Sequence, residues 1–178
     1  KLALKFQFVT AQRKGEIVAI ERTEIDRKKA VWRLPGTKTK NKIPHIVPLS
    51  RVALRILKDA EKNAGQSDWL FPSPTTERHI TDQSVDHAMR KNLTKLGLKD
   101  ARPHDLRRTA ATRMAEHGTP RLHLMKVLNH KDAGITATYD QYEYLPEKKQ
   151  ALEAWATQLS ALIRRHKSGQ GARSKVEK

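Results

Sequence analysis

The chain has 178 residues, and its 36 Lys and Arg residues against 19 Asp and Glu residues give a formal net charge of +17. This length predicts one domain with a core of its own. The absence of cysteine excludes a disulfide framework, a thiolate zinc site and a cysteine nucleophile. No apolar run approaches the roughly 20 residues that span a bilayer, so we expect a cytoplasmic protein with no membrane partner. The charge favours a polyanionic partner, with nucleic acid first and an anionic membrane surface second.

The beginning of the chain predicts a helix followed by a small sheet. The segment from Lys1 starts apolar without an N-cap residue, as expected for a domain cut from a longer protein inside or just before a helix. Helical periodicity then fails between Arg22 and Ser50. Within that stretch Ala30–Leu34 and His45–Leu49 are short β-leaning runs on either side of a lysine-rich hairpin. They predict a small three-stranded antiparallel sheet.

Apolar residues at helical spacing dominate the rest of the chain. Five helices are expected: from Ser50 to Gly65, from about Asp82 to Gly97, from about Asp105 to Gly118, from Pro120 to about Leu128, and from Glu147 to about His166. A segment of one or two helical turns is expected at Thr138–Tyr144, before the last helix. The fold class is therefore α+β and mainly α, with one domain over residues 1–166. Residues 167–178 combine Gly, Ser and charge, which predicts a disordered basic tail.

His104 and Arg107 form the first candidate site. They are three positions apart at the start of the third predicted helix, so they share a face and can reach one ligand together. The free N–H groups and the dipole of a helix N-terminus favour a phosphate at the same place. An isolated pair of this kind is more often a capping or surface feature.

A tyrosine cluster follows the fourth predicted helix. All three tyrosines of the chain, Tyr139, Tyr142 and Tyr144, lie in one short stretch after His130. A tyrosine can replace the missing cysteine as a covalent attacker on phosphorus. Its free pKa is about 10, so roughly 4 kcal/mol of activation must come from nearby positive charge or a base. Clustered aromatic residues more often simply pack against one another.

Five motifs occur in a distinctive order along the chain. They are Arg13 in TAQRKGEI, Lys40 in KTKNKIPHIVPLS, His104 and Arg107 in RPHDLRRTAATRMAEHG, His130 in VLNH, and Tyr139 in ITATYDQYEY. In this order they resemble the motifs of the tyrosine recombinases, the phage-integrase family of DNA strand-transfer enzymes. The phrases are most similar to those of prophage and genomic-island integrases. The resemblance covers the chain from about Leu2 to His166.

The resemblance implies the DNA breaking-rejoining fold and a six-residue catalytic set without metal or other cofactor. In that set Tyr139 is the nucleophile that forms a 3′-phosphotyrosyl bond, Arg13 and Arg107 clamp the non-bridging oxygens, His104 and His130 complete the phosphate cage, and Lys40 is the general acid toward the 5′-oxygen. The sequence departs from the family at Ala11, where the family usually has glycine.

Two of these assignments have rivals nearby. Lys38 lies in the same hairpin as Lys40, but counting eight residues back from Pro48, as the family pattern does, selects Lys40. The two later tyrosines compete with Tyr139, but the family's nine-residue step from His130 selects Tyr139.

The resemblance also implies partners and a biological role. We expect double-stranded DNA at specific recombination sites, a homo-tetramer of the full-length protein on paired sites, and a directionality factor. The expected setting is a bacterial or phage-encoded, nucleoid-associated enzyme that integrates or excises a mobile element, with N-terminal DNA-binding domains absent from this chain. The alternatives are a basic module that binds DNA without cutting it, a structural ribonucleoprotein component, and a type IB topoisomerase-like relaxing enzyme.

Overall fold

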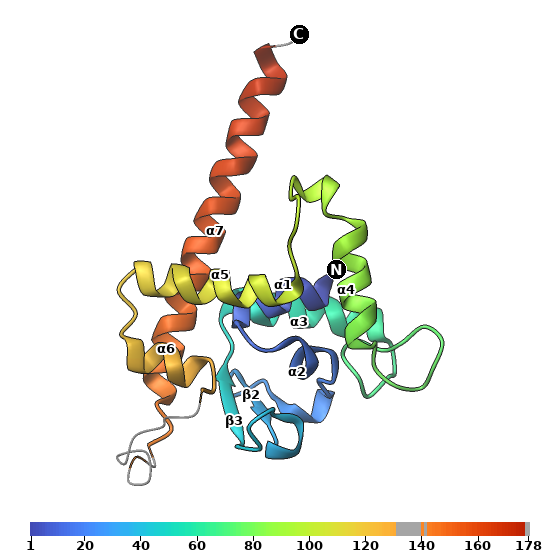
Figure 1. Ribbon diagram of the computed structural model, residues 1–178, viewed down its shortest axis with the longest axis vertical. Coiled ribbons are helices and arrows are strands. Elements are labelled where there is room, and N and C mark those ends of the chain that lie inside the picture. The colour runs from blue at the N-terminus through green and yellow to red at the C-terminus, as the bar shows by residue number, and fades with distance from the viewer. Residues whose placement is uncertain (131–139, 141, 177–178) are drawn as a thin grey trace.

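The computed structural model describes residues 1–130, 140 and 142–176 of the chain. Its elements, in chain order, are α1 (Leu2–Thr10), α2 (Lys14–Val18), η1 (Arg22–Glu24), β1 (Ile25–Asp26), β2 (Val31–Leu34), η2 (Gly36–Lys38), β3 (His45–Pro48), α3 (Arg51–Ala64), α4 (Asp82–Lys91), η3 (Thr94–Leu96), α5 (Pro103–Glu116), α6 (Arg121–Val127) and α7 (Leu145–Val176). The helices lie above and to one side of one small sheet in Figure 1, which confirms the mainly helical α+β class.

The sheet is antiparallel in the order β1-β2-β3. Trp32 on β2 is opposite Ile25 on one side and Val47 on the other. Arg33 is the one exposed residue of β2, and Val31, Trp32 and Leu34 are buried. The predicted β-leaning runs therefore form β2 and β3, with β1 as a short third strand.

The core is built around α1, which packs against α3, α5 and α7. Phe6 of α1 is fully buried, and its ring centroid lies 5.8 Å from that of Trp32. Trp155 brings α7 onto the other side of α1, where its indole N–H donates to the carbonyl of Phe8 at 2.9 Å. Burying an aromatic side chain of this size contributes about 1.5–3 kcal/mol. The two tryptophans thus fix the sheet and the last long helix to one central helix.

The helix α3 confirms the sequence prediction closely. Ser50 caps it by accepting from the backbone N–H of Ala53 at 3.3 Å. Helical spacing predicts an apolar stripe on this helix, and its residues are buried: Ala53, Ile56, Leu57 and Ala60. The helix ends at Ala64, and Gly65 follows with a φ of 58°.

The second predicted helix is shorter than expected. The helix α4 ends at Lys91, and Asn92 donates its side-chain amide to the carbonyl of Ala88 at 2.7 Å. A short polar side chain that bonds its own backbone favours helix ends over helix interiors. A separate turn, η3, follows, so Leu96 lies outside the helix that the periodicity predicted for it, and it is 57% exposed.

Helical spacing predicts an apolar stripe of Leu106, Ala110 and Met114 on this helix, and the buried face of α5 differs from that stripe. The helix begins at Pro103, two residues before the expected start, and its buried residues are Pro103, Arg107, Ala110 and Met114. Leu106, which the prediction put on the stripe, is only half-buried. A charged arginine therefore occupies a position of the core-facing stripe.

The helix α6 begins at Arg121 with Pro120 as its N-cap, one residue later than expected. The helix α7 is longer than predicted in both directions, and its second half projects from the body of the molecule (Figure 1). Leu162 and Ile163, which helical periodicity places on the apolar stripe of this helix, are therefore exposed. The helix α7 runs to Val176, and the disorder that composition predicts from residue 167 stays a prediction. In the part of the chain that is described, no helix is both long and apolar enough to cross a membrane.

Candidate active site

The turn after α6 collects side chains from distant parts of the chain. The last carbonyls of a helix lack intrahelical partners and carry the negative end of its dipole. Here the carbonyls of Val127, Leu128 and Asn129 each accept a side-chain hydrogen bond from another element. Asn129 closes the turn with a φ of 49°, a conformation that asparagine tolerates better than most residues. The turn thus presents a row of acceptors suited to cationic side chains.

Arg107 is held by two backbone carbonyls, one of them in this turn, and it is only 4% exposed. Its Nη1 donates to the carbonyl of Ala11 at 2.8 Å, and its Nη2 donates to the carbonyl of Leu128 at 2.5 Å. Burial lowers the pKa of Arg107 to about 10, and the nearby charge of Arg13 acts in the same direction. The side chain stays protonated at neutral pH, so the structure contains a buried and oriented cation.

His130 contacts the same guanidinium. Its Nε2 lies 3.3 Å from Nη2 of Arg107. A guanidinium can only donate, so Nε2 is the acceptor and the ring proton belongs on Nδ1. Burial lowers the pKa of His130, and the charges of Arg107 and Arg13 lower it further. His130 is therefore a neutral imidazole at pH 7 with one N–H to donate.

Arg13 reaches the turn from the start of α2. Its backbone N–H and its Nη1 both donate to the carboxylate of Glu16 at 3.0 Å, and its Nη2 donates to the carbonyl of Asn129 at 3.3 Å. The Glu16 side chain is almost fully buried, which fixes the orientation of the arginine. Ala11, at the position where the family usually has glycine, has a left-handed φ of 56°. The alanine therefore takes the conformation that a glycine would supply, and Arg13 still reaches the site.

The two rival lysines of the hairpin have different surroundings. Lys38 donates to the carbonyl of Ala19 at 2.9 Å and to the carboxylates of Glu21 and Glu24. Its ammonium also lies 5.1 Å from the ring centroid of Trp69. Lys38 is thus a structural cation within the fold, whereas the side chain of Lys40 is exposed.

One hollow of about 470 Å³ brings most of the predicted site together. Its lining residues are Arg13, Lys40, Asn41, His104, Arg107, Asn129 and His130. His104 is exposed at the second position of α5. None of the described lining residues is a carboxylate. Five of the six predicted catalytic residues thus line one cationic hollow, whereas Tyr139 lies outside the described residues.

Sequence reasoning missed Asn41 and Asn129, the two asparagines in the lining. The only local signal for either was a turn-favouring residue type next to a motif residue. Over the residues that the structure describes, no group of three or more His, Asp or Glu side chains is placed to hold a metal ion.

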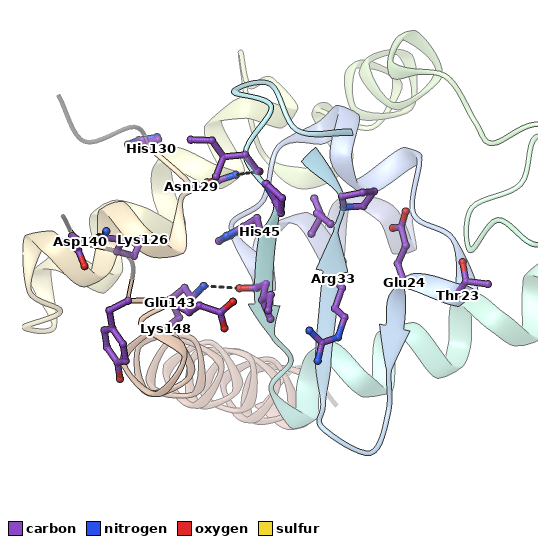
Figure 2. Close-up of a pocket in the computed structure, with 16 residues that line it drawn as sticks. Thr23, Glu24, Arg33, His45, Lys126, Asn129, His130, Asp140, Glu143 and Lys148 are labelled. Carbon is purple, nitrogen blue, oxygen red and sulfur yellow. Dashed lines mark hydrogen bonds and ion pairs between the residues drawn. The ribbon is translucent and has the colours of Figure 1, made fainter. Parts of the chain in front are cut away.

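A larger groove of about 990 Å³ adjoins the hollow and shares Asn129 and His130 with it. Figure 2 shows Lys148 reaching from α7 toward β3, where it donates to the carbonyl of Ile46 at 2.8 Å. Burial lowers the pKa of Lys148 to about 8. His45 on β3 is 5% exposed and donates from Nε2 to the carbonyl of Val127 at 3.2 Å. These contacts join the sheet to α6 and α7 behind the hollow.

The two rival tyrosines lie outside the lining of the hollow. Burial raises the pKa of Tyr142, and Glu147 raises it further. The pKa of Tyr144 is raised by its hydrogen bond with Asp140. A nucleophilic tyrosine needs the opposite shift.

The hollow brings together residues from four of the five motifs that resemble those of the tyrosine recombinases. The sequence profile of the Phage integrase family matches residues 1–145, and the chain belongs to this family. It is 28% identical over 163 residues to prophage integrase IntZ of Escherichia coli (strain K12). The matched region covers 90% of this chain and 40% of that protein. The chain therefore spans less than half the length of this relative.

Two solved structures share the fold at lower identity. The integrase from mycobacterium phage Brujita has a TM-score of 0.66 at 18% identity, covering 86% of this chain and 51% of that one. The XerH site-specific recombinase, bound to its difH substrate in a pre-cleavage complex, has a TM-score of 0.62 at 16% identity. That match covers 74% of this chain and 39% of the recombinase.

Proposed function

We propose that this chain is the catalytic domain of a site-specific DNA recombinase that cleaves and rejoins strands through a 3′-phosphotyrosyl intermediate. The observation that carries the proposal is the single hollow lined by Arg13, Lys40, His104, Arg107 and His130. These residues come from four separate segments of the chain. That they line the same hollow supports binding of one common ligand, and the positive charge of the lining suits a phosphodiester.

The electrostatics of the hollow fit phosphoryl transfer. Negative charge on the non-bridging oxygens must be stabilised in the transition state, and preoriented donors do this at little cost during the reaction. Arg13 and Arg107 would bind those oxygens, since planar guanidinium groups suit this task better than ammonium groups. His130 would donate one more hydrogen bond through Nδ1.

Tyr139 would supply the nucleophile, as the nine-residue step from His130 indicates. Its Oη would attack phosphorus, and the phenolic proton would pass to His104. The bond from phosphorus to the 5′-oxygen would break, and Lys40 would give that oxygen a proton. Ligation would run the same steps in reverse. The raised pKa values of Tyr142 and Tyr144 support this choice among the tyrosines.

Double-stranded DNA is the proposed partner. The net charge of +17 supplies the phosphate attraction that DNA binding requires. Related folds have been solved with DNA, including XerH on difH and the Tn1549 transposon integrase with circular intermediate DNA. We assign residues 1–166 to the catalytic domain. Tetramer assembly on paired sites, control by a directionality factor and action in the cytoplasm belong to the proposal for the full-length protein.

A covalent trap tests the proposal. The ends of the mobile element that the full-length protein joins are sequenced, and a nicked suicide duplex is built on that junction. We expect an adduct that survives SDS, and Tyr139→Phe should abolish it while DNA retention at low salt persists. Tyr142→Phe is the matched control and should keep the adduct.

Each alternative has its own outcome. An adduct that persists in Tyr139→Phe would show that the nucleophile is another residue. A parent protein that binds the duplex but never forms the adduct would favour the binding module. Relaxation of plasmids without any joining of paired sites would favour a topoisomerase-like enzyme.

A further inference from the structure

We propose that Asn41 and Asn129 form a clasp that positions Lys40 over the scissile phosphate, so that Asn41 is a positioning residue for protonation of the 5′-oxygen. The inference rests on the proposed function, and it assigns a role to two residues outside the six-residue catalytic set. Both asparagines line the hollow beside that set.

The clasp is a reciprocal amide pair. Nδ2 of Asn41 lies 3.2 Å from Oδ1 of Asn129, and Nδ2 of Asn129 lies 3.3 Å from Oδ1 of Asn41. Nδ2 of Asn41 also donates to the backbone carbonyl of Asn129 at 3.0 Å. Asn129 is 9% exposed, so these bonds are shielded from competing water.

Each end of the clasp is itself fixed. Oδ1 of Asn41 accepts from the backbone N–H of Ile43 at 3.2 Å, which closes a local turn around the amide. The backbone carbonyl of Asn129 is shared with Nη2 of Arg13 at 3.3 Å. The clasp therefore joins the hairpin that carries Lys40 to the phosphate-binding arginine and to the turn that leads into His130.

Lys40 is held between two anchors. Two residues before it, Lys38 ties the hairpin to Glu21 and Glu24. One residue after it, Asn41 ties the hairpin to the turn at Asn129. The backbone around Lys40 is thus fixed on both sides while its own side chain stays exposed and free to reach a bound strand. A general acid must lie within hydrogen-bond reach of the leaving oxygen, and a shift of about 1 Å can cost 100-fold in rate.

The protonation of O5′ by Lys40 can be tested separately from the rest of the cleavage reaction. The bond from Tyr139 Oη to phosphorus forms, the bond from phosphorus to O5′ breaks, and a proton from Lys40 Nζ neutralises O5′. A substrate with sulfur in place of the bridging O5′ releases a thiolate. Because the corresponding thiol has a pKa of only about 8.5, this leaving group needs no proton from Lys40. A residue that acts only by positioning Lys40 becomes dispensable with the sulfur substrate.

The test compares Asn41→Ala with the parent on suicide duplexes that differ only in this bridging atom. We expect Asn41→Ala to slow adduct formation about 10- to 100-fold on the oxygen duplex and to come within about 3-fold of the parent on the sulfur duplex. Lys40→Ala should give the same pattern with a larger loss on oxygen. Thr37→Ala, exposed in the same hairpin, is the matched control and should follow the parent on both duplexes.

A second variant tests the pairing itself. Asn129→Gly keeps a residue that adopts positive φ and keeps the carbonyl acceptor, but it removes the side-chain half of the clasp. We expect a smaller loss than in Asn41→Ala. The double variant should be no slower than Asn41→Ala alone, since both changes break one interaction.

Other outcomes overturn the proposal. Equal slowing of Asn41→Ala on both duplexes would mean a general structural defect, and parental rates on the oxygen duplex would mean that Lys40 needs no clasp. If the parent forms no adduct on either duplex, the proposed function fails. Amide hydrogen exchange over residues 36–44 then decides whether the clasp holds the hairpin, with faster exchange expected in Asn41→Ala and unchanged exchange refuting it.

Discussion

Arg107 and His130 lie within hydrogen-bonding distance, with Nη2 of the arginine 3.3 Å from Nε2 of the histidine. The contact sets the state of both groups. The buried guanidinium gains an acceptor, and the imidazole is kept neutral by burial and by the adjacent positive charge. Three N–H donors of Arg107 are therefore used within the protein, by Ala11, Leu128 and His130, and the tautomer of His130 is fixed.

The first prediction concerns the fork of Arg107. Arg107→Lys keeps a positive charge but cannot reach the carbonyls of Ala11 and Leu128 and the ring of His130 with one fixed group. We expect adduct formation to fall about 100-fold or more, as for the loss of an oriented donor at an oxyanion. Burst kinetics on the suicide duplex measure this.

The control is Arg108→Lys on the same helix, because the Arg108 side chain is 74% exposed. Its rate should stay close to that of the parent. Equal rates for both variants would show that the fork geometry of Arg107 is unimportant.

The second prediction separates the two rival lysines by phenotype. Lys38→Ala removes the cation that pairs with Glu21 and Glu24 and leaves those carboxylates unpaired. We expect about 2 kcal/mol of lost stability. Lys40→Ala should leave stability within about 0.5 kcal/mol of the parent, since the side chain is exposed, but should nearly abolish cleavage. Urea unfolding and adduct formation are measured on both variants, and the reverse pattern would exchange their roles.

Motif spacing predicted much of the site because each motif is local in sequence. His104 and Arg107 are three residues apart on one helix, so the helical period alone places them together. The count from Pro48 to Lys40 works similarly within one hairpin. The meeting of these motifs in space depends on α1, α5 and the turn after α6, and their contacts follow from packing that no single segment encodes.

Two features could not be predicted for identifiable physical reasons. The polarity of Arg107 removed it from the expected apolar stripe, because a helical wheel does not anticipate a cation buried among backbone carbonyls. The pair of Asn41 and Asn129 spans 88 residues, and neither side chain carries a local signal beyond a preference for turns. Leu162 and Ile163 show another limit of sequence prediction. Periodicity identifies their apolar helix face but does not show whether anything covers it, and both side chains are exposed.

The third prediction concerns the close approach at Gly36, at the base of the hairpin that carries Lys40. A Cβ at this position would lie 2.6 Å from the backbone carbonyl oxygen of Lys42, so backbone must move. We expect Gly36→Ala to cost about 1–3 kcal/mol and to slow cleavage by displacing the hairpin. Gly15→Ala is the control, because its Cβ would make an ordinary 3.6 Å contact with Asp82. Thermal unfolding of the two variants measures the difference, and equal stability would refute the steric argument.

The last prediction is a pH dependence that originates at His45. Burial, with the charge of Lys148 adding to it, lowers the pKa of His45 to about 3 from an ordinary value of 6.5. In the unfolded chain His45 therefore becomes protonated near pH 6.5, whereas in the folded chain it becomes protonated only near pH 3. Stability from this group is complete above pH 6.5 and falls as the pH is lowered through that window.

The loss of stability that His45 causes at pH 4.5 should be about 2–3 kcal/mol relative to pH 7.5. His45→Gln cannot titrate, and its amide can still donate to the carbonyl of Val127, so the difference in unfolding free energy between the two pH values should shrink by that amount. His87→Gln, at an exposed position of α4, is the control and should retain the parental difference. Urea unfolding at both pH values measures these differences, and equal pH dependence in His45→Gln and the parent would contradict the assignment.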